Sequence, residues 1–113
     1  MIAVIFELIP KPSKTDAYFD IAAALRPSLE IMDGFISVER FQSLTEPGKY
    51  LSLSFWRDEN AVTEWRNQTV HRGAQSQGRS DIFRDYRLRV AHVARDYGLV
   101  QRNQAPADSI EAH

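Results

Sequence analysis

His71 is the residue of this chain that is best suited to acid–base chemistry. An imidazole has an unperturbed pKa of about 6.5, so it could take a proton from a phenolic substrate or ligate iron. Trp65 precedes His71 by six residues, and Gln75 follows it by four. On a continuous helix, Gln75 would therefore lie closer than Trp65 to the helix face that carries His71. We predict His71 as a catalytic residue and Gln75 as a substrate contact. The alternative is a half-buried histidine that hydrogen-bonds to backbone.

Arg72 follows the histidine and is one of seven arginines between residues 66 and 95, a segment with only two acidic residues. A guanidinium can bind a carboxylate through two parallel N–H donors, or stabilise an oxyanion that develops during a reaction. We predict Arg72 as the residue that holds such an anion. Surface and interface ion pairs are the more common use of such arginines.

Trp56 and Trp65 are the two tryptophans of the chain. Either ring could form the wall of a cavity for a small aromatic molecule. Together with Phe41, we predict them as substrate contacts. As core residues they would need no further role. A buried indole N–H needs an acceptor, however, which is a reason to expect polar groups beside them.

The chain lacks the residue sets that several other chemistries require. It contains no cysteine, which removes disulfides, thiolate metal sites and cysteine nucleophiles. No histidine lies within four residues of another, and we predict no metal site. The net charge of −1 gives no general attraction to nucleic acid or to an anionic membrane. No apolar run approaches the ~18 residues of a membrane span, and the first strand does not resemble a signal peptide, so we expect a cytoplasmic protein.

Hydrophobic periodicity predicts the elements that position these residues. Ile2–Ile9 is almost wholly apolar and rich in β-branched residues, which favours a buried strand. We expect a helix to begin with an approximate capping box at Ser13–Asp16 and to end at Asp33-Gly34. Pro27 should kink or end the regular helix. The buried stripe of this helix consists of Tyr18, Ile21, Ala22, Leu25 and Leu29.

Three more strands and a second helix follow. Phe35–Gln42, with Ile36 and Val38 on one face, and Tyr50–Trp56 read as a hairpin around a Pro-Gly turn. Asp58 caps a helix through Trp65, and Thr69 is a second candidate helix start. Tyr86–Tyr97 reads as a long final strand. Residues 99–113 are polar and are predicted as a flexible tail, so the folded domain spans residues 1–98.

The element order is β-α-β-β-α-β, the split βαβ or ferredoxin-like plan of the α+β class. It predicts a four-stranded antiparallel sheet with both helices on one face. We expect apolar side chains on the other face too, which a second sheet would cover most simply. The sequence therefore predicts a homodimer through the sheet. The residues assigned to that second face are Ile5 or Phe6, Tyr50, Trp56, Ala91 and Val93.

Several motifs within this plan resemble the antibiotic biosynthesis monooxygenase family. Members of this family are dimeric α+β barrels. They include cofactor-free quinone-forming monooxygenases, haem-degrading enzymes and members of no known activity. The resemblance covers about residues 2–97 and is carried by Asp33-Gly34-Phe35, Ser54-Phe55-Trp56, Asp58–Val62, Trp65 and His71.

Two subgroup patterns of the family are each only partly present. Haem-degrading members carry an Asn on the first strand, a Trp in the second helix and an axial His about ten residues later. Trp65 fits, but Gln75 occupies the His position and the first strand has no Asn. Quinone-forming members carry an Asn four residues before a Trp that ends the third strand, and a Tyr six residues after it. Trp56 fits, but Ser52 and Val62 replace its two partners.

The resemblance implies a cofactor-independent monooxygenase that acts on a small aromatic or polyketide-like substrate, and this is our preferred hypothesis. In that chemistry His71 takes the phenolic proton, an arginine holds the developing anion, and the electron-rich phenolate reacts directly with O₂. Two alternatives remain open. One is a haem-binding or haem-degrading protein with His71 as a non-standard ligand, and the other is a non-catalytic dimer that binds a small molecule.

Overall fold

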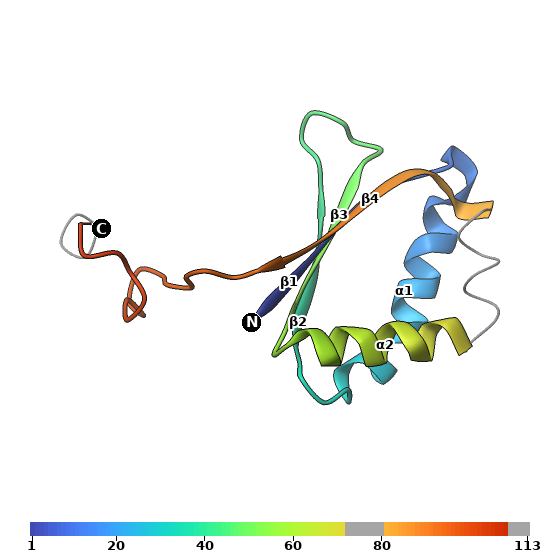
Figure 1. Ribbon diagram of the computed structural model, residues 1–113. Coiled ribbons are helices and arrows are strands. Elements are labelled where there is room, and N and C mark those ends of the chain that lie inside the picture. Colours follow the sequence, from blue (N-terminus) through green and yellow to red (C-terminus); the bar gives the residue numbers. More distant parts are fainter. Residues whose placement is uncertain (72–80, 109–113) are drawn as a thin grey trace.

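The computed structural model describes residues 1–71 and 81–108, which form a four-stranded antiparallel sheet with two helices on one of its faces (Figure 1). The strand order is β2-β3-β1-β4. This order and the helices on one face confirm the predicted ferredoxin-like α+β plan. The elements are β1 (Ile2–Pro10), a 3₁₀ turn η1 (Pro12–Lys14), α1 (Thr15–Glu30), β2 (Phe35–Gln42), β3 (Tyr50–Trp56), α2 (Glu59–His71) and β4 (Phe83–His92).

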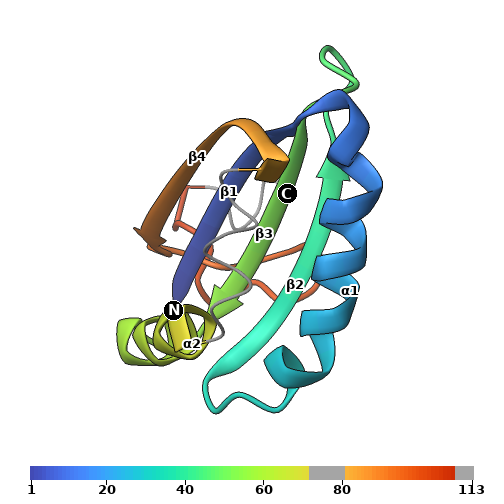
Figure 2. The ribbon, with the colours of Figure 1, turned by 90° about the vertical axis from the view of Figure 1, so that its right-hand side faces the viewer.

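Two buried clusters hold the helices to the sheet. One joins Ile2 and Trp56 of the sheet to Leu29 of α1 and to Ala61 of α2. The other joins Leu8 of β1 to Tyr18 of α1 and to Ile82, which directly precedes β4. Figure 2 shows that α1 runs alongside β2, whereas α2 lies by the N-terminal end of β1. The first cluster therefore holds both helices to the sheet, whereas the second holds only α1.

The start and the course of α1 differ from the prediction. The N-cap residue is Lys14 and makes no side-chain capping bond, so the capping box predicted at Ser13–Asp16 is wrong. Pro12 and Ser13 already turn the chain as η1, which places Ser13 inside a turn rather than at a cap. The helix also continues through Pro27 to Glu30. Pro27 is exposed, so water can solvate the carbonyl that loses its donor, while buried Leu29 holds the last turn in the core.

β2 has the predicted bounds but contains a bulge near its start. Phe35 pairs with Trp56 and Ser37 pairs with Phe55, which leaves Ile36 as the extra residue. Phe35 and Val38 both pack against the first cluster, whereas the Ile36 side chain is exposed. The prediction that Ile36 and Val38 share a face is therefore wrong, because the bulge resets the alternation between them.

β4 begins earlier and ends earlier than predicted. Its last residue, His92, pairs with Ile2 at the beginning of β1. One further hydrogen bond runs from the Val93 N–H to the carbonyl of Met1, the residue before β1. Residues 93–97 therefore leave the sheet although their alternation is strand-like. The strand ends where its neighbour does.

β3 presents its two faces in the opposite sense to the prediction. Trp56 is almost fully buried on the helix side, and Tyr50 packs against the second cluster on that side. The prediction that these two aromatic residues face away from the helices is wrong, because Trp56 pairs with Ile2 and shares its place in the core. The alternate residues Leu51, Leu53 and Phe55 consequently point away from both helices.

We call the sheet surface that faces away from the helices the open face. The register aligns Ile5 and Leu53 across its middle, with Ala3 and Phe55 on one side of them and Glu7 and Leu51 on the other. Glu7 lies 3.4 Å from Arg89 and 3.6 Å from Lys49. The open face therefore carries an apolar centre with ion pairs beside it. Its described residues are Ala3, Ile5, Glu7, Ser37, Glu39, Phe41, Leu51, Leu53, Phe55, Arg87, Arg89 and Ala91.

The C-terminal segment leaves the sheet on the side opposite the helices (Figure 1). Residues 93–108 contain neither helix nor strand, although the Gly98 N–H donates to the Gln101 carbonyl and Arg102 lies over the Tyr97 ring. The domain boundary at residue 98 stays a prediction. Within residues 1–71 and 81–108, no helix is both long and apolar enough to cross a membrane.

Candidate functional site

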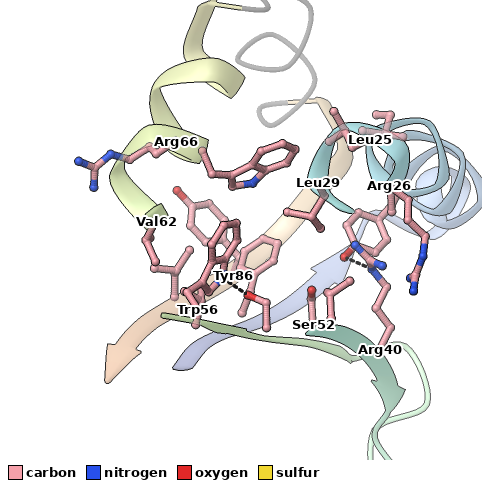
Figure 3. Close-up of a pocket in the computed structure, with 18 of the residues that line it drawn as sticks. Leu25, Arg26, Leu29, Arg40, Ser52, Trp56, Val62, Arg66 and Tyr86 are labelled. Atoms are coloured by element: carbon pink, nitrogen blue, oxygen red, sulfur yellow. Dashed lines mark hydrogen bonds between the residues drawn. The ribbon is translucent and has the colours of Figure 1, made fainter. Parts of the chain in front are cut away.

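The candidate site is a cavity of about 360 Å³ between the helices and the sheet. Cavities of this size hold small organic ligands. α1 contributes Leu25 and Leu29, α2 contributes Val62, and the helix side of the sheet contributes the remaining wall, with Tyr86 from β4 (Figure 3). The described wall is mainly aliphatic and aromatic. It therefore suits a molecule with a large apolar part.

Trp56 and Trp65 form the aromatic part of this wall. Their ring centroids lie 6.4 Å apart with planes inclined by 36°. The Trp56 indole N–H donates to the Ser54 hydroxyl at 2.9 Å, which supplies the polar partner that a buried indole requires (Figure 3). Two predicted substrate contacts are thus brought together from a strand end and a helix.

β3 brings both hydroxyl groups and aromatic rings to the cavity. Because side chains alternate along a strand, Tyr50, Ser52, Ser54 and Trp56 share the helix side. Ser52 and Ser54 both line the cavity. The less apolar face of β3 is therefore the one that faces the protein's own helices. It places two hydroxyl groups in a wall that is mainly apolar.

Three arginines also line the described wall, and none of its residues is acidic, cysteine or histidine. Arg26 is paired with Glu30 at 2.8 Å on the exposed side of α1. The Arg66 side chain points away from Trp56 and Leu29 (Figure 3). Arg40 comes from β2, and its Nε–H donates to the Tyr18 hydroxyl at 3.2 Å. Within the described residues, no group of three His, Cys, Asp or Glu could hold a metal ion.

α2 is held in place by a polar junction at its start. The Ala61 N–H donates to Asp58 at 2.9 Å, which confirms the predicted cap, and this bond together with Arg57 lowers the pKa of Asp58 below its usual range. Arg57 also pairs with Asp33 at 3.1 Å, and its own N–H donates to the Gly34 carbonyl. The junction ties the turn before β2 to the helix that carries Trp65. The helix runs without interruption to His71, so Thr69 does not restart it.

The other predicted site residues lie outside this described cavity. His71 is the last residue of α2, and its side chain lies outside the described residues, as do Arg72 and Gln75. Phe41 pairs with Leu51 on the open face and does not line the cavity. The functional roles given to these residues stay predictions.

Sequence reasoning missed Arg40, Ser52 and Ser54 as cavity residues. A signal for Arg40 was present, because it lies two residues after Val38 and so shares the face of a core residue. An arginine on the inward face of a strand is uncommon without a partner. The serines could have been found only by assigning the faces of β3 correctly.

Comparison with known proteins agrees with this architecture. A chain from Mycobacterium tuberculosis, Rv0793, superimposes with a TM-score of 0.73 at 20% identity, covering 86% of this chain and 98% of that one. At this identity the similarity shows the fold alone. A Bacillus subtilis protein named YqjZ is 32% identical over 101 residues, which cover 89% of this chain and 85% of that protein.

A second relative has a name that states an activity. A Pyricularia oryzae protein named jasmonate monooxygenase ABM is 52% identical over 93 residues, which cover 82% of this chain and 43% of that protein. The match thus spans less than half of the Pyricularia protein. The sequence model of the family described as antibiotic biosynthesis monooxygenase matches residues 1–77. On these grounds the chain belongs to the antibiotic biosynthesis monooxygenase family.

Proposed function

We propose that this protein is a monooxygenase that oxidises a small, largely apolar organic molecule in the cavity between α1, α2 and the sheet. The observation that carries the proposal is the cavity itself, with its paired tryptophans and its two serines. Membership of the family and the name of the Pyricularia relative support the reaction type. An apolar wall desolvates the reacting ring, and the few hydroxyl groups orient it.

For an aromatic or polyketide-like substrate the reaction needs no bound cofactor. A phenol supplies both electron pairs that reduce O₂. One oxygen atom becomes the new ring carbonyl, and the other leaves as water with the phenolic hydrogen and the ring hydrogen. We assign the base that removes the phenolic proton to His71 and the stabilisation of the resulting anion to Arg72. Trp56 and Trp65 hold the ring.

The Pyricularia relative favours a second candidate substrate, which is jasmonate. This molecule is a small carboxylate whose remainder is mostly hydrocarbon, so it matches an apolar cavity with arginines at its wall. Insertion of oxygen into an isolated C–H bond consumes two electrons that the substrate does not supply. Such a reaction would therefore depend on an added reductant, whereas phenol oxidation would not.

Oxygen uptake by the purified protein tests the proposal. We expect uptake in air with at least one member of a panel of phenols, quinols and jasmonate, assayed with and without a reductant. His71→Ala should lower the rate with a phenol by roughly 10²- to 10⁴-fold, since a positioned base contributes that much. Ser52→Phe should abolish uptake by placing a ring within the cavity. Ser52→Ala, which removes one orienting hydroxyl but leaves the cavity open, is its matched control and should retain measurable uptake.

Two results would contradict the proposed reaction, and a third would contradict its location. One is the absence of uptake with every member of the panel. The other is a haemin titration that gives stoichiometric binding and a Soret band that is lost in His71→Ala, because that result would make the protein a haem protein. The third result is uptake by Ser52→Phe at the wild-type rate, which would show that the reaction does not take place in this cavity.

We further propose that the working protein is a homodimer formed through the open face. In β3 the strictly apolar side, Leu51, Leu53 and Phe55, is the one turned away from the helices. A contiguous apolar surface of this kind is rarely left in water. A second copy related by a two-fold axis would place the same residues against it, and such isologous contacts are the commonest in homodimers.

A further inference from the structure

Arg40 occupies an unusual position for a charged residue. It lies on the helix side of β2, two residues after Val38, and its side chain is part-buried in the cavity wall. Its Nε–H donates to the Tyr18 hydroxyl, and its guanidinium carbon lies 5.9 Å from the centroid of the Tyr18 ring. Both contacts hold the guanidinium in place, and neither neutralises its charge.

No carboxylate of the described residues lies within ion-pair distance of Arg40. The contrast with the two other arginines of the wall is clear. Arg26 is paired with Glu30, and the Arg66 side chain points away from Trp56 and Leu29 (Figure 3). Arg40 instead extends from β2 toward α1 (Figure 3). Among residues 1–71 and 81–108, no acceptor lies within hydrogen-bond distance of its two terminal nitrogens, which lie beside an apolar cavity.

The part-buried guanidinium of Arg40 would be stabilised by an anion in the cavity. Removing a guanidinium from water is costly unless a negative partner and hydrogen bonds compensate for it. Because Tyr18 already occupies Nε–H, the terminal nitrogens are left to form the parallel pair of bonds that a carboxylate accepts.

We propose that Arg40 binds the carboxylate of an amphipathic organic acid, while the hydrocarbon part of that acid lies against Trp56 and Trp65. Tyr18 acts as the positioning residue for the guanidinium. The inference rests on the proposed function, since it names the chemical class of molecule that enters the same cavity. The contacts of the acid are with the protein itself, so its binding can be measured apart from turnover.

The test compares each acid with its own neutral ester by calorimetric titration. The probes are jasmonate with methyl jasmonate, and 1-naphthaleneacetate with its methyl ester. We expect the wild-type protein to bind at least one acid roughly 10- to 100-fold more tightly than its ester, as hydrogen bonds to charged groups allow. Arg40→Met should remove this preference and leave affinity for the ester within about threefold. Tyr18→Phe should weaken only the acid, by a smaller factor.

Arg26→Met is the matched control, because Arg26 lines the same cavity but already has a partner in Glu30. It should keep the preference for the acid. The inference is overturned if acid and ester bind equally to the wild-type protein, if neither binds, or if Arg40→Met weakens both alike. It is also overturned if Arg26→Met loses the preference as Arg40→Met does. Oxygen uptake decides the proposed function separately, so preference for the acid without uptake would sustain this inference and reject the reaction.

Discussion

Leu53→Arg is expected to convert the protein from a dimer into a monomer. Leu53 lies at the centre of the open face, between Ile5 of β1 and Glu39 of β2. A long charged side chain there would have to be desolvated, or paired at the cost of close packing, when a second sheet covers it. We expect the dissociation constant to rise by at least about 100-fold, which corresponds to roughly 3 kcal/mol. Sedimentation velocity should report one chain of 13.0 kDa in place of two.

The monomer should remain folded, because Leu53 is only half-buried in a single chain and Glu39 offers the new guanidinium a neighbouring carboxylate. Circular dichroism checks this point. Ile31→Arg is the matched control, since Ile31 is 85% exposed at the end of α1, away from the open face. A wild-type protein that sediments as a monomer, or a Leu53→Arg protein that stays dimeric, would reject the proposed dimer.

Gly34→Ala is expected to destabilise the fold by about 2–5 kcal/mol. Gly34 has a φ of +86°, a conformation that costs a residue with a side chain about 1–2 kcal/mol. A Cβ atom there would also lie 2.6 Å from the Cβ of Ala61, and forced overpacking costs about 1–3 kcal/mol. Because Ala61 is buried in the first turn of α2, the clash pushes that helix and its Trp65 away from the sheet.

Chemical denaturation measures this loss as a lower midpoint. Gly48→Ala is the matched control, because nothing lies within 4 Å of the added atom and its φ is not positive. The double variant Gly34→Ala with Ala61→Gly should recover part of the loss, since it removes the close contact but keeps the unfavourable φ. A Gly34→Ala protein as stable as Gly48→Ala would show that the junction does not constrain α2.

The order of the elements could be predicted from the sequence because each has a clear hydrophobic period and an end signal. Tyr50–Trp56 alternates strictly, but a period of two does not say which side faces the helices. Both sides of this strand contain large apolar residues, so the assignment depended on its register with β1, and Trp56 opposite Ile2 decides it. The bulge at Ile36 and the early end of β4 likewise depend on neighbouring strands, not on local sequence.

The candidate site was predictable only in its aromatic part. Large aromatic rings tend to be buried, and the ring centroids of Trp56 and Trp65 lie 6.4 Å apart in the fold. Arg40 could not be recognised with the same ease, because a charged residue in a strand is usually assigned to the solvent side. Its place in the cavity wall, held by Tyr18, becomes evident only from the three-dimensional structure.

Isotopic labelling of the product tests the central claim most directly, namely that this protein is a monooxygenase that works in the cavity between helices and sheet. The panel compound that supports oxygen uptake is converted under ¹⁸O₂ by the wild-type protein and by Ser52→Phe, and the products are analysed by mass spectrometry. We predict one ¹⁸O atom in the wild-type product, with the second in water, and no labelled product from Ser52→Phe. A product whose new oxygen comes from water, or equal labelling by both proteins, would contradict the account.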